Sequence, residues 1–110
     1  MAVVHVVLFS FKESATQEEI EDVYKGMVAL KDKCIHPTTN QPYIKSAKGG
    51  INNSPAGLDG GIQYAFVSEF ESVEDRDYFN QKDSVHLELV AKLSILSKVQ
   101  VIDFTPGVFA

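Results

Sequence analysis

The sequence has few of the features that mark disulfide-bonded, membrane-embedded or nucleic-acid-binding proteins. Its single cysteine, Cys34, leaves no partner for an internal disulfide, which is typical of a reducing compartment, and we expect a cytoplasmic protein. The apolar N-terminal run at residues 2–11 is too short to span a bilayer and follows no basic segment, so we expect no membrane association and no signal peptide. Ten basic residues, scattered singly, stand against fifteen acidic ones, and this balance argues against a nucleic-acid partner.

What the sequence does contain is the composition of one folded domain. The chain has 110 residues, enough for one hydrophobic core and too few for two. Its apolar fraction of 45% and charged fraction of 23% are those of an ordinary globular protein, and no like-charge block or low-complexity tract interrupts the chain. We therefore expect a single domain over residues 1–110.

Hydrophobic periodicity and capping signals predict the secondary structure. Thr16 and Glu19 form a capping box ahead of an amphipathic stretch, and the turn-rich segment 52–61 predicts a long loop. The expected elements are a strand at 2–12, a helix at about 17–34, a weak strand at 43–51, a strand at 62–71, a short helix opened by the capping box Ser72-Val73-Glu74-Asp75, a helical segment capped by Asp83 or Ser84, and a strand at 98–105.

This order of elements, β-α-β-β-α-β, predicts an α+β fold of the ferredoxin-like type with one antiparallel sheet. The helices can cover only one face of such a sheet. The strands at 2–12, 62–71 and 98–105 are nevertheless apolar on both faces, so another surface must cover the second face. A second copy of the chain is the simplest candidate, because two-fold homodimers are the commonest assembly. We therefore expect a homodimer in which the sheet of a second copy covers this face.

Three stretches resemble the stress-responsive A/B-barrel family, which also includes plant polyketide cyclases of the olivetolic acid cyclase kind. They are VVHVVLFSFK at 3–12, FESVE at 70–74 with its continuation to Tyr78 and His86, and VIDFTP at 101–106. The segment between Tyr78 and His86 is two residues longer than in cyclase-like members and lacks their His-Pro pair, which is more similar to the fungal branch. The resemblance implies a homodimer whose two sheets close into a dimeric α/β barrel.

The resemblance also implies a set of site residues. In the family's cyclases, a histidine on the first strand and a histidine before the last long helix face one cavity, and a tyrosine lies between them in the sequence. The matching residues here are His5, His86 and Tyr78, and Asp103 matches an aspartate near the end of the last strand. Each has a structural interpretation as well. Both histidines can be core residues, Tyr78 can serve helix packing, and Asp103 needs a hydrogen-bond partner such as an imidazole or a backbone amide.

Further residues would line an apolar cavity around these groups. The odd-numbered side of the first strand carries Phe9 and Phe11, and Leu89 shares the helical stripe of His86. Tyr24 projects from the apolar stripe of the first helix, where it can donate a hydrogen bond to a substrate or be an ordinary core residue.

Three functions remain open from the sequence. The first is a cofactor-independent enzyme of the cyclase or lyase type that acts on small hydrophobic ketides or aromatics, with the two histidines as proton-transfer groups. The second is a non-catalytic stress-associated protein that is structural or binds a ligand, and the third is a cofactor-free monooxygenase. We expect no metal, because Cys34 and His36 supply only two ligands at a helix end.

Overall fold

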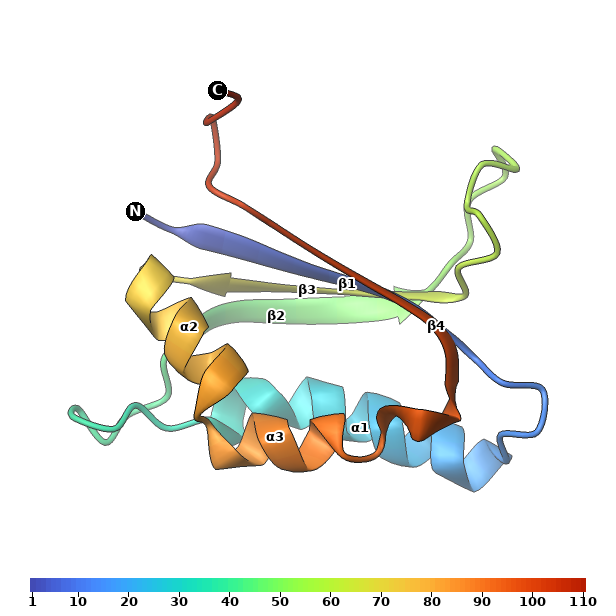
Figure 1. Cartoon of the computed structure of the whole chain (residues 1–110), viewed down its shortest axis with the longest axis horizontal. Helices are drawn as coiled ribbons and strands as arrows, with labels where there is room; N and C mark the ends of the chain where they lie inside the picture. The colour runs from blue at the N-terminus through green and yellow to red at the C-terminus, as the bar shows by residue number, and fades with distance from the viewer.

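The computed structural model describes residues 1–110 and contains one four-stranded antiparallel sheet with all its helices on one side (Figure 1). Its elements are β1 (Val3–Phe11), α1 (Gln17–Lys33), β2 (Ile44–Ile51), β3 (Tyr64–Phe70), α2 (Val73–Gln81), α3 (Ser84–Val90), the 3₁₀ turn η1 (Leu93–Ile95) and β4 (Leu96–Phe104). The strand order is β2-β3-β1-β4. This is the ferredoxin-like α+β fold that the sequence predicts. None of the helices combines the length and apolarity needed to cross a bilayer.

Local sequence signals set where the helices begin. The Thr16 hydroxyl accepts the Glu19 amide at 3.1 Å, and the Glu19 carboxylate accepts the Thr16 amide at 2.8 Å, so the predicted capping box is formed at the start of α1. Ser72 caps α2. Asp83 caps α3 by accepting the Val85 amide at 3.0 Å. These caps fix the positions of the helices that cover the sheet.

The hydrophobic core lies between the sheet and the helices. Odd-numbered residues of β1 face the helices, and cross-strand pairing extends this face to Phe66 of β3, which lies opposite Val7. From α1, the side chains of Val23, Met27 and Leu30 pack onto this layer, each at most 5% exposed. Burial of one such side chain stabilises the fold by about 1.5–3 kcal/mol. The sheet and α1 therefore form the fixed frame on which α2 and α3 are placed.

The opposite face of the sheet carries no helix (Figure 1). It is apolar nonetheless: Val4 and Val6 of β1 pair with Phe104 and Ile102 of β4, which are 48% and 55% exposed. Exposed apolar surface of this kind is typical of a protein–protein contact.

Two segments rise from this uncovered face at opposite ends of the sheet (Figure 1). One is the loop 52–63 between β2 and β3, and the other is the tail 105–110 after β4. The tail does not pack on its own sheet edge, since Phe109 is 98% exposed.

Candidate functional site

A cavity of about 260 Å³ lies between the sheet and the helices, and both candidate histidines line it. His5 comes from β1, and His86 comes from the first turn of α3. The polar side chains beside them are Ser68 and Asn80. Most of the remaining wall is apolar and includes Val7, Met27, Leu30, Phe66, Leu89 and Val101. The fold thus brings two imidazoles that are far apart in the sequence to one largely apolar space.

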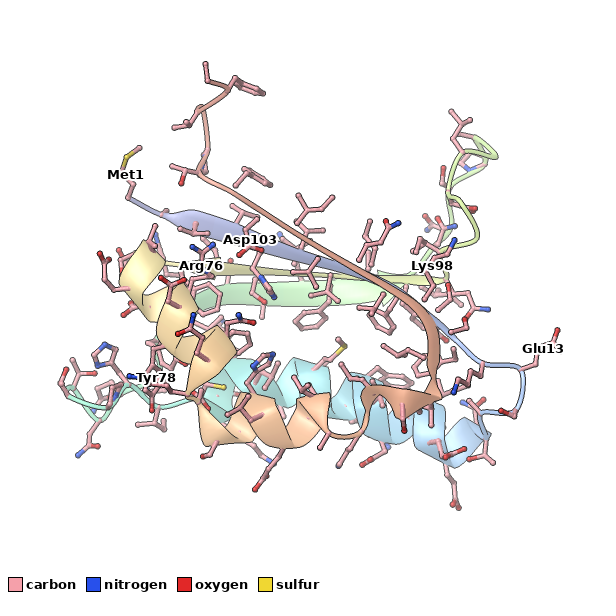
Figure 2. The ribbon with its side chains drawn as sticks, viewed as in Figure 1. Met1, Glu13, Arg76, Tyr78, Lys98 and Asp103 are labelled. Carbon is pink, nitrogen blue, oxygen red and sulfur yellow. The ribbon has the colours of Figure 1, made fainter.

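His5 is held by a carboxylate on the neighbouring strand. Asp103 of β4 lies directly opposite His5 in the β1–β4 register, and His5 Nδ1 lies 2.7 Å from Asp103 Oδ1. The second oxygen of Asp103 accepts a hydrogen bond from Arg76 Nη1 of α2, also at 2.7 Å. Figure 2 shows Arg76 and Asp103 pointing toward one another from α2 and β4. The carboxylate therefore has the partners that its position inside the fold requires.

These contacts of Asp103 with His5 and Arg76 fix the tautomer of His5. Asp103, paired with a guanidinium, is ionised and can only accept hydrogen bonds, so the Nδ1 of His5 carries the proton that it shares with Asp103. In the neutral ring, Nε2 is then the nitrogen with a free lone pair. Hydrogen bonds to Asp103 and to Asp77 raise the pKa of Arg76. Arg76 is therefore a permanent positive charge at the end of the hydrogen-bonded series His5–Asp103–Arg76.

His86 is stacked on an aromatic ring and has a free nitrogen. Its ring lies 4.0 Å from the ring of Phe79, centroid to centroid, with the planes 29° apart. Phe79 also contacts His5 edge-on at 5.9 Å, so it lies between the two imidazoles. The Nδ1 atom of His86 is buried and has no hydrogen-bond partner in the chain. A buried polar atom of this kind demands a partner, such as water or a ligand group.

Burial lowers the pKa of His86 below its usual value of 6.5. The charge that His5 carries when it is protonated lowers the pKa further, while the backbone of Phe79 and the charge of Asp83 act in the opposite direction. His86 is therefore largely neutral at pH 7 and able to accept a proton.

A buried polar cluster sets the position of α3. Asp83, only 3% exposed, caps α3 and accepts a hydrogen bond from the Tyr43 hydroxyl at 2.6 Å. Cys34 lies against the same carboxylate, and burial, followed by the charge of Asp83, raises its pKa to about 12. A thiol of this kind is inert as a nucleophile. The cluster instead anchors the helix that carries His86.

Of the four candidate substrate-binding residues, only Leu89 lines the histidine cavity. Tyr24 and Phe9 line a second cavity of about 200 Å³, between α1 and the β2–β3 edge of the sheet. Met27 and Phe66 line both cavities, so their side chains stand between the two spaces. The structure therefore separates Tyr24 and Phe9 from the imidazoles by a wall of two side chains.

Phe11 and Tyr78 also lie elsewhere. Phe11 is at the far end of β1, against the ring of Tyr64 at 5.3 Å. Tyr78 packs edge-on against Tyr43 at 5.9 Å, and Figure 2 shows it at the end of α2 remote from Asp103. The next residue along the helix, Phe79, faces the cavity in its place, because successive helical residues point about 100° apart.

The third histidine, His36, belongs to the loop before β2. Its Nδ1 accepts the Thr38 amide at 3.2 Å, and its Nε2 lies 3.2 Å from Asp75 Oδ1. These contacts organise the loop. No group of three or more His, Cys, Asp or Glu side chains is arranged to hold a metal ion.

Comparisons with known proteins agree with this fold. The family described as the stress responsive A/B barrel domain matches residues 3–106. The stress-response A/B barrel domain-containing protein HS1 of Arabidopsis thaliana is 34% identical over 103 residues, which are 93% of this chain and 87% of HS1. A crystal structure of an Arabidopsis thaliana protein superposes with a TM-score of 0.76 at 34% identity and 98% coverage of both chains.

Two structures of lower identity share the fold. The hydroxynitrile lyase of Passiflora edulis has a TM-score of 0.80 at 24% identity, covering 99% of this chain and 97% of the lyase. A Thermobifida fusca protein, described as dimeric and ferredoxin-like, has a TM-score of 0.70 at 22% identity, covering 94% of this chain and 90% of that one. With a matched segment that spans nearly its whole length and a relative above 30% identity, the chain belongs to the stress-responsive A/B barrel domain family.

Proposed function

We propose that the protein works as a homodimer whose cavity binds a small, largely apolar ligand, on which His86 and His5 move a proton without a cofactor. The observation that carries the proposal is the apolar cavity of about 260 Å³ that both imidazoles line, one of them with a buried nitrogen that lacks a partner. Ligand sites combine apolar walls with few polar groups in this way. The volume lies just below the usual range for drug-sized ligands, which favours a small ligand.

The chemistry that suits this cavity is proton abstraction from a carbon next to a carbonyl. Neutral His86 takes the proton, the C–H electron pair moves toward the carbonyl oxygen, and an enolate forms. The protonated form of His5 is the second proton-transfer group: it gives its Nε2 proton to that oxygen, which turns the enolate into an enol, and Asp103 fixes its ring and balances its charge. Small ketides and aromatic ketones carry such a carbonyl on an apolar body. This reaction is the first step of a polyketide cyclisation, and it needs only the two imidazoles and an apolar wall.

The ability to enolise a ketone is testable without the natural substrate. We would incubate the protein in D₂O with a phenyl alkyl ketone and follow deuterium incorporation next to the carbonyl by NMR. His86→Gln should lower the protein-catalysed rate by about 10²–10⁴-fold, and His5→Gln should also lower it. His36→Gln is the matched control, because this ring lies in the loop before β2 and outside the cavity. Unchanged exchange in His86→Gln would overturn the assignment.

A non-catalytic ligand-binding protein is the alternative, and the predominance of apolar walls favours it. It predicts that the same ketones bind in the cavity but gain no deuterium above the background rate. A cofactor-free oxygenase is a third candidate, and oxygen uptake with an added quinol would support it. The expected cytoplasmic location stays a prediction.

The homodimer is supported by the uncovered apolar face of the sheet, where Ile102 and Phe104 are about half exposed. Covering that face with a second sheet stabilises the assembly by about 25 cal/mol per Å² of apolar surface, before the cost of association. Light scattering at micromolar concentration should give the mass of a dimer.

A further inference from the structure

A third hollow, of about 700 Å³, lies on the sheet face opposite the histidine cavity. The outer side of the sheet forms its floor, and the loop 52–63 forms one wall. Its apolar lining includes Leu8, Ile51, Leu58, Ile62, Ala65 and Val67. Leu58 is 89% exposed. A large apolar surface is therefore open on the face that no helix covers.

The loop 52–63 is held in place by hydrogen bonds within the loop and to β1. Asn52 Nδ2 donates to Asp59 Oδ2 at 2.6 Å, and Asp59 Oδ1 accepts the Gly61 amide at 2.9 Å. The Ser10 hydroxyl donates to the Gly61 carbonyl at 2.7 Å, which ties the loop to β1. The hollow is thus preformed, and an occupant would not need to order the loop on binding.

The tail after β4 is the other apolar projection on this face. Gly107 has a φ of 82°, in the left-handed region, and the Val108 amide donates to the Thr105 carbonyl at 3.1 Å. This turn directs the chain away from its own sheet, and Val108 and Phe109 are 53% and 98% exposed. Figure 1 shows the tail at one end of the uncovered face and the loop 52–63 at the other end.

We propose that the tail of one copy fills the hollow of a second copy. The proposal rests on the homodimer proposed above. In a two-fold dimer, the same surface of both copies must be complementary to itself. A two-fold axis that is parallel to the sheet and perpendicular to the strands places the tail of each copy over the loop 52–63 of the other copy. Both tails then meet a hollow. A two-fold axis along the strands would set tail against tail and hollow against hollow, and neither hollow would then receive a tail.

Phe109 is the anchor of this contact. A buried aromatic side chain removes about 150–250 Å² from water, and two of them supply a substantial part of the roughly 1,600 Å² that a stable interface buries. Lys48 and Asp59 line the hollow beside the apolar residues and would form the polar rim that protein interfaces have. The tail residues Val108 and Phe109 carry no charge to oppose burial.

The test is a cross-linking experiment between differently tagged copies. One copy carries Leu58→Cys and the other carries Ala110→Cys, which leaves the anchor Phe109 in place, and the two are co-expressed and treated with a short bismaleimide. Cys34 is fully buried, so unmodified protein is the control for background reaction. The proposal predicts a cross-link in the mixed sample and none with either variant alone. Cross-linking of Ala110→Cys with itself, or a dimer without the mixed cross-link, would overturn it.

A second measurement does not depend on reactive groups. Phe109→Ser should raise the dimer dissociation constant by about 30-fold or more, as removal of an interface anchor does. Val28→Ser is the matched control, since Val28 is 63% exposed on α1, on the helix side of the sheet, and its substitution should leave the constant unchanged. An unchanged constant in Phe109→Ser overturns the tail contact alone. A monomeric unmodified protein overturns the homodimer as well.

Discussion

The placement of His86 depends on a buried carboxylate, and removal of that carboxylate has a calculable cost. Asp83 accepts the Tyr43 hydroxyl and caps α3 through the Val85 amide, so Asp83→Ala removes both interactions. The buried Tyr43 hydroxyl, left without its partner, costs about 1–3 kcal/mol, and the lost cap costs about 1 kcal/mol. We expect the free energy of unfolding to fall by about 2–4 kcal/mol.

The loss should appear as a lower melting temperature. For 110 residues, an unfolding entropy of about 2.1 cal/mol/K per residue makes each kcal/mol equal to roughly 4 °C, so the expected fall is roughly 9–17 °C. The assay is thermal unfolding followed by far-UV circular dichroism at one fixed protein concentration, because dimerisation makes the Tm depend on concentration.

A double-mutant cycle with Tyr43→Phe separates the two contributions. In the Tyr43→Phe background no phenol is left unpaired, so Asp83→Ala should cost only the cap, about 1 kcal/mol. The reasoning is refuted if Asp83→Ala costs the same in both backgrounds, because the hydroxyl would then contribute nothing to the loss.

The remaining predictions concern single residues. Because burial raises the pKa of Cys34 to about 12, its thiol at pH 8 should react with a maleimide on the order of 10³-fold more slowly in the folded protein than in urea, and equal rates would contradict its burial. A Cβ on Gly49 would lie 2.5 Å from the Ala65 carbonyl oxygen, so Gly49→Ala should cost about 1–3 kcal/mol in urea unfolding, whereas Gly50→Ala, with open space around it, should not. The pKa of His86 is lower in the folded chain than its usual 6.5, so as the pH falls His86 is protonated in the unfolded chain before it is protonated in the folded chain. The free energy of unfolding should therefore decrease as the pH falls from about 6.5 through the lowered pKa. This part of the pH dependence should be absent in His86→Gln, and identical profiles would contradict it.

The alternation of side chains along strands and their spacing along helices predict most of the fold and part of the site. The alternation along β1 puts His5 on the face that the helices cover, and the spacing of His86 and Leu89 puts both on the inner side of α3. The antiparallel register then places Asp103 directly beside His5. These features follow from local geometry, which a sequence reveals.

The parts that the sequence did not reveal depend on how elements pack. The alternation along a strand predicts which face of the sheet a side chain lies on, but not which cavity on that face it lines. Phe9 and His5 share a face of β1 and line different cavities. Arg76 escaped prediction because its partner Asp103 lies on a strand far along the chain, and no local pattern links the two. Phe79 rather than Tyr78 faces the cavity because the rotation of α2 about its axis is set by tertiary contacts.

The claim that both imidazoles serve one ligand site can be measured directly by NMR of the histidine side chains. The protein has three histidines, and His36 lies outside the cavity as an internal reference. Titration with a phenyl alkyl ketone should shift the ring signals of His5 and His86 together, with one common dissociation constant, and leave those of His36 unchanged. If the ketone binds and the signals of His5 and His86 do not move, or move with different constants, the two imidazoles do not form one site.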